Sequence, residues 1–213
     1  MHWRLRFSCP KVNSYVEVLK TNLGNRYTIV KAAKGGTTML KTSRCYSQNA
    51  TSCSYWDTTE WQMALKSKPN IVTIMLGTND AKTFNFNGVG QNNGLFFSVD
   101  YFDMIRTLRT LPTSPKIFIV IPPPVYSPYP FEINSKNLNQ IIPNLLHKIA
   151  SAADIEVIDV RAQFTKSKLA GTGLTCDGCH PSHEGNMIIA EVMAHAIKNY
   201  TSNTNRGNVV GGK

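Results

Sequence analysis

Long apolar runs are missing from this 213-residue chain, and the apolar stretches it has match buried strands in length. No run approaches the ~18 residues of a membrane-spanning helix, so the sequence predicts no membrane span. Residues 1–7 also lack the apolar core of a signal peptide. This leaves two interpretations of the start: the protein is not exported by that route, or its true beginning precedes Met1.

Acidic residues are scarce, with 13 Asp and Glu against 23 Lys and Arg, which gives a net charge of +10. The basic residues are scattered, with no basic run, no zinc-finger spacing and no RNP-like aromatic motif. The excess of positive charge therefore indicates a solvated basic surface, and the sequence predicts no nucleic-acid partner.

Metal-ligand spacings are also missing, because Cys176-Asp177-Gly178-Cys179 has no second CxxC and no HxxxH to complete a zinc site. A redox or zinc CxxC stays the alternative, but we expect no metal and no cofactor. We expect disulfides between Cys45 and Cys53 and between Cys176 and Cys179, with Cys9 left over.

Two glycosylation sequons, at Asn49 and Asn199, accompany the cysteine pair that brackets the loop at residues 45–53. Both features favour an oxidising compartment. The sequence therefore predicts a secreted glycoprotein.

Short apolar strands alternate with amphipathic helices along the whole chain. Strands are predicted at residues 27–33, 70–76, 116–121 and 156–160, and helices at 12–23, 59–66, 99–111, 138–153 and 182–199. This order predicts an α/β domain over residues 1–200, with a parallel sheet covered on both faces. The polar, Gly-rich residues 201–213 are expected to form a flexible tail.

Asp177 and His180 lie in the loop that leads into the last helix. An aspartate three residues before a histidine can bind one imidazole nitrogen, which fixes the tautomer and raises the basicity of the other nitrogen. The alternative is a surface histidine that follows an aspartate by chance. The spacing makes the pair a candidate for acid–base catalysis.

Two further motifs follow predicted strands. Gly77-Thr78-Asn79-Asp80 follows residues 70–76, and Gly35-Gly36 follows residues 27–33. Functional loops collect at the carboxyl ends of parallel strands, where the Asn79 amide and the Gly36 N–H could donate to an oxyanion. Ordinary turns are the alternative, because Gly, Asn and Asp all favour them.

Taken together, these motifs resemble the SGNH hydrolases, also called GDSL esterases and lipases. Gly36-Thr37-Thr38, Gly77-Thr78-Asn79-Asp80 and Asp177-Gly178-Cys179-His180-Pro181 match their second, third and fifth blocks in order. The resemblance implies a three-layer α/β/α sandwich with a parallel five-stranded sheet. It also implies His180 as general base, Asp177 as its orienting acid, and Asn79 and Gly36 as oxyanion donors.

The chain departs from that family at the first block, because the Gly-Asp-Ser that carries the nucleophile is absent. Ser8 is the only serine that follows anything strand-like, residues 3–7, and it is a weak candidate. Either residues 3–7 replace the first strand, or the N-terminus is truncated. Leu5 and Phe7 alternate with arginines, which favours truncation.

Within the family the chain looks most like sialate-type carbohydrate O-acetylesterases. We therefore expect hydrolysis of a small acyl ester, acetyl on a carbohydrate, through an acyl-serine. One alternative is a non-catalytic relative that keeps a carbohydrate-binding cleft. Another is a lysophospholipase or lipase-type esterase, in which Tyr126, Tyr129 and Phe131 line an acyl pocket; these rings could equally stack on a sugar or pack their loop.

Overall fold

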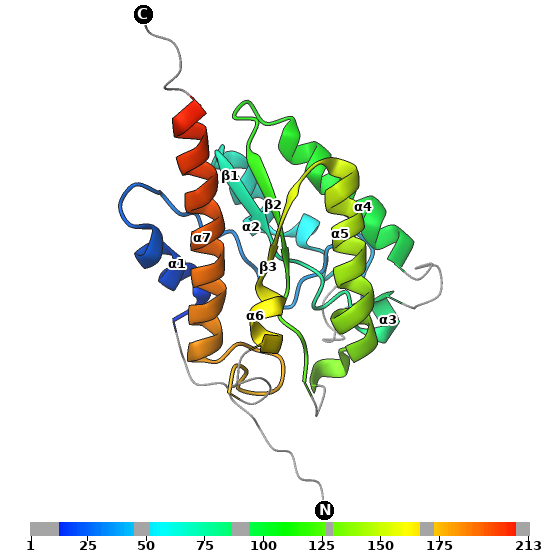
Figure 1. The fold of residues 1–213 in the computed structure, drawn as a ribbon. Helices are drawn as coiled ribbons and strands as arrows, with labels where there is room; N and C mark the ends of the chain where they lie inside the picture. Colours follow the sequence, from blue (N-terminus) through cyan, green and yellow to red (C-terminus); the bar gives the residue numbers. More distant parts are fainter. Residues whose placement is uncertain (1–12, 45–51, 87–93, 127–129, 167–172, 208–213) are drawn as a thin grey trace, which may run out of the picture.

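The computed structural model describes residues 13–44, 52–86, 94–126, 130–166 and 173–207. A parallel sheet lies between two layers of helices (Figure 1). Its strands are β1 (Ile71–Ile74), β2 (Lys116–Ile121) and β3 (Glu156–Asp159), in the order β1-β2-β3. Ile74 is opposite Ile119, and Ile121 is opposite Asp159, so the three strands point the same way.

The central strand β2 determines both layers, because its side chains alternate between them. Ile117, Ile119 and Ile121 pack on the layer formed by α2, α4 and α5. Phe118 and Val120 pack on the layer formed by α1, α6 and α7. The helices are α1 (Tyr15–Leu23), α2 (Thr59–Lys66), α3 (Thr83–Phe86), α4 (Leu95–Arg109), α5 (Ile142–Ala153), α6 (Val160–Lys166) and α7 (His183–Gly207), with short η1 (Tyr55–Asp57), η3 (Pro130–Glu132) and η4 (Asn137–Ile141).

The strand expected at residues 27–33 does not form. Half-buried Tyr27, Ile29 and Ala32 lie among exposed residues, much as in a strand with one buried face, but the segment pairs with no strand of the described chain. A groove of about 610 Å³ is lined by residues 26–34 and also by residues 67–76, which include β1. A β-strand forms only when its backbone hydrogen-bonds to a neighbouring strand. The groove separates residues 27–33 from β1, so they have no such neighbour in the described chain.

The last helix is longer than expected, because α7 runs to Gly207 where an end near Asn199 and a loose tail from residue 201 were predicted. No Pro or Gly lies between Asn186 and Arg206. The Thr201 hydroxyl donates to the Ile197 carbonyl and lies 2.7 Å from the Tyr27 hydroxyl. These contacts hold the extra turns against the segment that follows α1.

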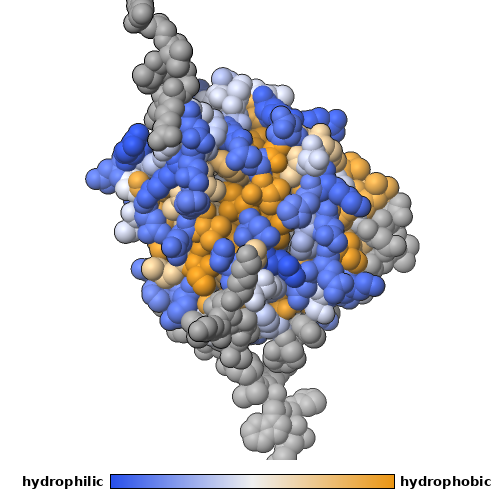
Figure 2. Space-filling model, in the orientation of Figure 1, coloured by the Kyte–Doolittle hydropathy of each residue, from blue (hydrophilic) through white to orange (hydrophobic). Residues whose placement is uncertain are grey.

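Figure 2 shows an apolar strip on one face, between the polar outer surfaces of α7 and α5, over the edge strand β3. None of the described helices is both long and apolar enough to cross a membrane.

Candidate active site

The motif after β1 begins at a position that requires glycine. Gly77 has φ +131°, and a Cβ built there would lie 3.1 Å from the Ile142 side chain. A larger residue would be strained by its backbone and crowded by α5. Gly77 therefore lets the chain turn sharply at the end of β1 and present Thr78, Asn79 and Asp80.

Asn79 and Asp80 bind the segment that follows Gly36. The Asn79 Nδ2 donates to the Thr37 carbonyl at 3.2 Å. The two Asp80 carboxylate oxygens accept from the backbone N–H groups of Met39, at 3.0 Å, and Leu40, at 2.9 Å. The second and third motifs are thus joined by three hydrogen bonds, although 40 residues separate them in sequence.

Asp80 is fully buried. Burial raises the pKa of its carboxyl from 3.8 to about 6, although the hydrogen bonds from Leu40 and Met39 act in the opposite direction. The sequence did not lead us to predict that Asp80 joins the second and third motifs. Its place four residues after the strand predicted at residues 70–76 was the available signal.

Gly36 lies in an exposed turn with φ +80°, and no atom lies within 4 Å of the place where its Cβ would be. One N–H of the Asn79 amide is used by Thr37, and an amide carries two. Both expected oxyanion donors are therefore at one edge of the sheet.

Asp177 and His180 form the expected pair. The Asp177 Oδ1 accepts from the backbone N–H groups of Cys179, at 2.9 Å, and His180, at 2.7 Å, and Oδ2 lies 2.6 Å from His180 Nδ1. Burial would raise the pKa of Asp177, but these hydrogen bonds outweigh it and hold the pKa below its usual value. An ionised carboxylate only accepts, so Nδ1 carries the proton and Nε2 is left as the base.

The two side chains of this pair differ in exposure. The Asp177 side chain is 4% exposed, and the His180 side chain is 59% exposed. The carboxylate is thus held inside the loop, while the imidazole is accessible to a substrate.

The expected disulfide between Cys176 and Cys179 is wrong, because Cys179 is a free thiol. Cys53 and Cys176 each take part in a disulfide, and Cys9 and Cys45 lie outside the described residues, so the pairing of Cys45 with Cys53 stays a prediction. Cys176 forms its disulfide with another cysteine, which leaves the Cys179 thiol free. Burial, and then the charge of Asp177, raises the pKa of the Cys179 thiol to about 12, which makes it a poor nucleophile.

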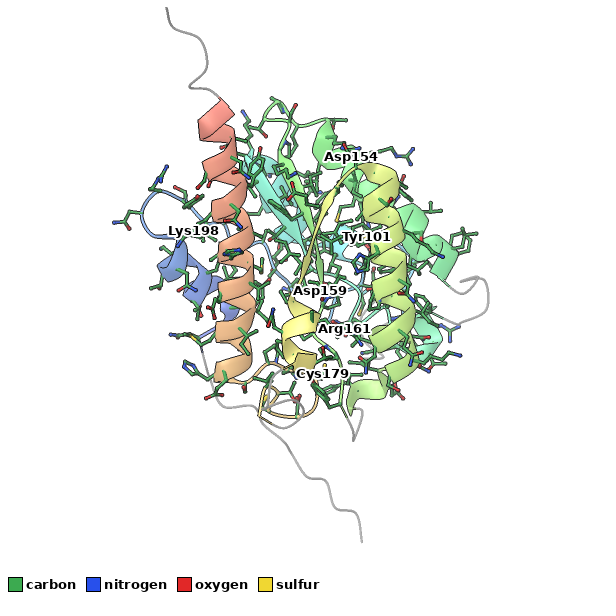
Figure 3. The ribbon with its side chains drawn as sticks, in the orientation of Figure 1. Tyr101, Asp154, Asp159, Arg161, Cys179 and Lys198 are labelled. Atoms are coloured by element: carbon green, nitrogen blue, oxygen red, sulfur yellow. The ribbon has the colours of Figure 1, made fainter. Side chains whose placement is uncertain are left out.

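The loops that carry Asn79 and His180 lie against each other. They are joined by the turn at residues 131–133, because Ile133 forms an antiparallel bridge with Lys82 and the Phe131 ring lies 5.1 Å from the His180 ring. The loop after β2 is attached to the same place, because the Tyr126 N–H donates to the Gly178 carbonyl at 2.8 Å. In Figure 3, Cys179 lies below Asp159, on the side of the molecule toward which β3 runs. The motifs therefore converge at the carboxyl ends of the strands.

Among the aromatic residues after β2, Phe131 contacts this pair. Its ring lies 5.1 Å from the His180 ring at 74°. Tyr126 is half-buried beneath the loop, and its hydroxyl lies 3.4 Å from the Phe164 carbonyl. Tyr129 lies outside the described residues, as does Ser8.

The GDSL-like lipase/acylhydrolase family matches residues 9–188. An acetylxylan esterase from Xylanibacter ruminicola is 29% identical over an alignment of 201 residues, and the match covers 86% of this chain but only 38% of that protein. A Mycobacterium smegmatis aryl esterase structure has a TM-score of 0.64 and 18% identity, and covers 87% of this chain and 85% of its own. A carbohydrate acetylesterase from Sinorhizobium meliloti has a TM-score of 0.63 and 20% identity, with 92% of each chain covered.

Proposed function

The chain belongs to the GDSL-like lipase/acylhydrolase family, and we propose that it hydrolyses a small acyl ester, acetyl on a carbohydrate, through an acyl-serine intermediate. The observation that carries the proposal is the hydrogen bond between Asp177 and His180, on a loop next to the Asn79 loop. This arrangement supplies a base, the group that orients it and donors for an oxyanion.

In the proposed reaction, Nε2 of His180 takes the proton of the attacking serine hydroxyl. The serine oxygen bonds to the acyl carbon, and the carbonyl oxygen takes negative charge beside Asn79 Nδ2 and the Gly36 N–H. His180 then gives its proton to the departing alcohol, and water repeats the sequence on the acyl-serine. Asp177 stabilises the imidazolium that forms at each step.

Support for acetyl and for a carbohydrate comes from relatives that carry these words in their names, an acetylxylan esterase and a carbohydrate acetylesterase. The chain spans 38% of the length of the first of these, and the second is 20% identical. A long-chain lipid ester is the competing substrate, and comparison of acetate with decanoate esters separates the two.

The test is hydrolysis of 4-nitrophenyl acetate by the 213-residue chain and by a version extended upstream to include a Gly-Asp-Ser. His180→Ala should abolish turnover, and His183→Ala, an exposed histidine in the first turn of α7, serves as its matched control. Turnover that persists in His180→Ala would contradict the proposal.

Ser8 is the nucleophile candidate within this chain. If the 213-residue chain turns over and Ser8→Ala stops it, Ser8 is the nucleophile. If only the extended version turns over, the serine lies upstream. If neither version is active but acetylated sugars bind, the chain is a non-catalytic relative with a carbohydrate-binding cleft. The missing Gly-Asp-Ser favours this alternative.

We infer also that the complete sheet has five strands. Residues 27–32 have the burial of a half-buried strand, and the groove that they share with β1 would let an inserted strand pair with both. Hydrogen exchange tests whether residues 3–7 are that strand. Deletion of residues 1–8 should then speed exchange of the Ile71–Ile74 amides, and unchanged exchange would contradict this placement.

A further inference from the structure

Phe131 is an exposed aromatic residue beside the candidate base. The residue is 44% exposed, although its ring packs edge to face on the His180 imidazole. Its exposed face is apolar surface beside the candidate base that a bound substrate could cover.

The backbone holds Phe131 in an unusual conformation. Phe131 has φ +60° and Glu132 has φ +59°, and two consecutive non-glycine residues in the left-handed region are uncommon. Such strain persists only where the surrounding structure enforces it, and it is concentrated at functional sites.

The contacts that enforce this turn come from the segment after Asn79. Ile133 is buried and forms an antiparallel bridge with Lys82. The Ala81 carbonyl accepts from the Asn134 N–H at 3.2 Å and from the Asn137 Nδ2 at 3.1 Å. The turn that presents Phe131 is therefore fixed to the loop that carries the candidate oxyanion donor.

The chemistry of acyl transfer indicates which half of an ester lies against Phe131. The carbonyl oxygen lies toward Asn79 and Gly36, and the alcohol oxygen lies toward His180, which must protonate it as the acyl–oxygen bond breaks. A side chain that packs on His180 consequently borders the alcohol and not the acyl group.

We propose that Phe131 forms the subsite for the alcohol half of the ester and selects an alcohol that carries a sugar ring. This rests on the function proposed above. The C–H face of a sugar ring can cover the exposed phenyl face. The carboxylate of Glu132, exposed in the same turn, can accept hydrogen bonds from the sugar hydroxyls. Phe131 thus determines specificity through contact with the substrate.

The kinetic test compares two acetate esters that give the same acetyl-enzyme, an O-acetylated monosaccharide and ethyl acetate. Phe131→Ala should lower kcat/KM for the sugar ester about tenfold, within the range for a lost aromatic contact, mainly by raising KM. The loss for ethyl acetate should be at least about fivefold smaller than the loss for the sugar ester, and Phe131→Tyr should retain both activities. Equal losses on the two esters, or no loss on either, would overturn the proposal, because a residue that only positions His180 cannot distinguish alcohols.

A binding test keeps the proposal separate from turnover. The deacetylated monosaccharide is titrated into the 213-residue chain and followed by NMR of the His180 and Phe131 side chains. Binding should weaken about tenfold in Phe131→Ala. Absence of binding to the unmodified chain would overturn the subsite. Binding without hydrolysis of any ester would instead contradict the catalytic function and leave the subsite standing.

Phenyl acetate is the control that separates a sugar from any other ring. If Phe131→Ala lowers kcat/KM for phenyl acetate as much as for the sugar ester, the selection of a sugar is overturned.

Discussion

Asp80 should make the protein less stable as the pH rises from 4 to 7, which is opposite to the usual behaviour of a carboxylate. Burial raises the pKa of this carboxyl from 3.8 to about 6, so the folded protein binds the proton more tightly than the unfolded chain does. The stabilisation is complete below pH 4 and is lost as the pH rises through 6. One pKa unit corresponds to about 1.4 kcal/mol, so the loss should be about 3 kcal/mol.

The assay is urea denaturation of the wild type and of Asp80→Asn at pH 4, 5, 6 and 7. Other carboxylates titrate in this range, so the relevant quantity is the difference in free energy of unfolding between the two proteins. That difference should shift by about 3 kcal/mol against the wild type between pH 4 and pH 7. A constant difference, or one that shifts in favour of the wild type, would refute the reasoning. If Asp80→Asn does not fold, the amide NMR shifts of Met39 and Leu40, which bind the carboxylate, should titrate in the wild type near pH 6.

Two further substitutions test the site, and a third tests the packing of α7. Asn79→Ala should lower kcat by about 10²- to 10³-fold with little change in KM, measured with an acetyl ester, because an oxyanion donor is lost. Asp177→Asn should lower kcat by about 10⁴-fold while circular dichroism stays unchanged, because the amide favours the wrong tautomer of His180. Gly185→Ala should lower the melting temperature by several degrees, because its Cβ would lie 2.3 Å from the Leu174 carbonyl oxygen; an unchanged melting temperature would contradict this packing.

The strands that the sequence located well are those whose signal is local. Lys116–Ile121 is a run of apolar and β-branched residues that fills the centre of the sheet, and prediction and structure agree on its limits. Residues 27–33 carry a similar pattern but pair with nothing in the described chain, because pairing depends on a neighbouring strand that local sequence does not encode.

The same distinction applies to the site. The Asp177–His180 hydrogen bond spans three residues, and spacing was enough to predict it. The bonds from Asp80 to residues 39 and 40, and the contact of Phe131 with His180, join segments about 40 to 50 residues apart and depend on the tertiary fold. Cys179 is a free thiol because Cys176 forms its disulfide with another cysteine, and motif spacing does not reveal that pairing.

The sheet ends on both sides in strands that pair only once within the described chain, and this has a consequence for the protein in concentrated solution. An edge strand can recruit a strand from another molecule, and β1 offers such an edge whenever the strand proposed for its groove is not in place. The net charge of +10 keeps molecules apart at low ionic strength, and salt screens that repulsion. Aggregation should therefore increase with both protein concentration and salt, and storage buffers of low ionic strength should limit it.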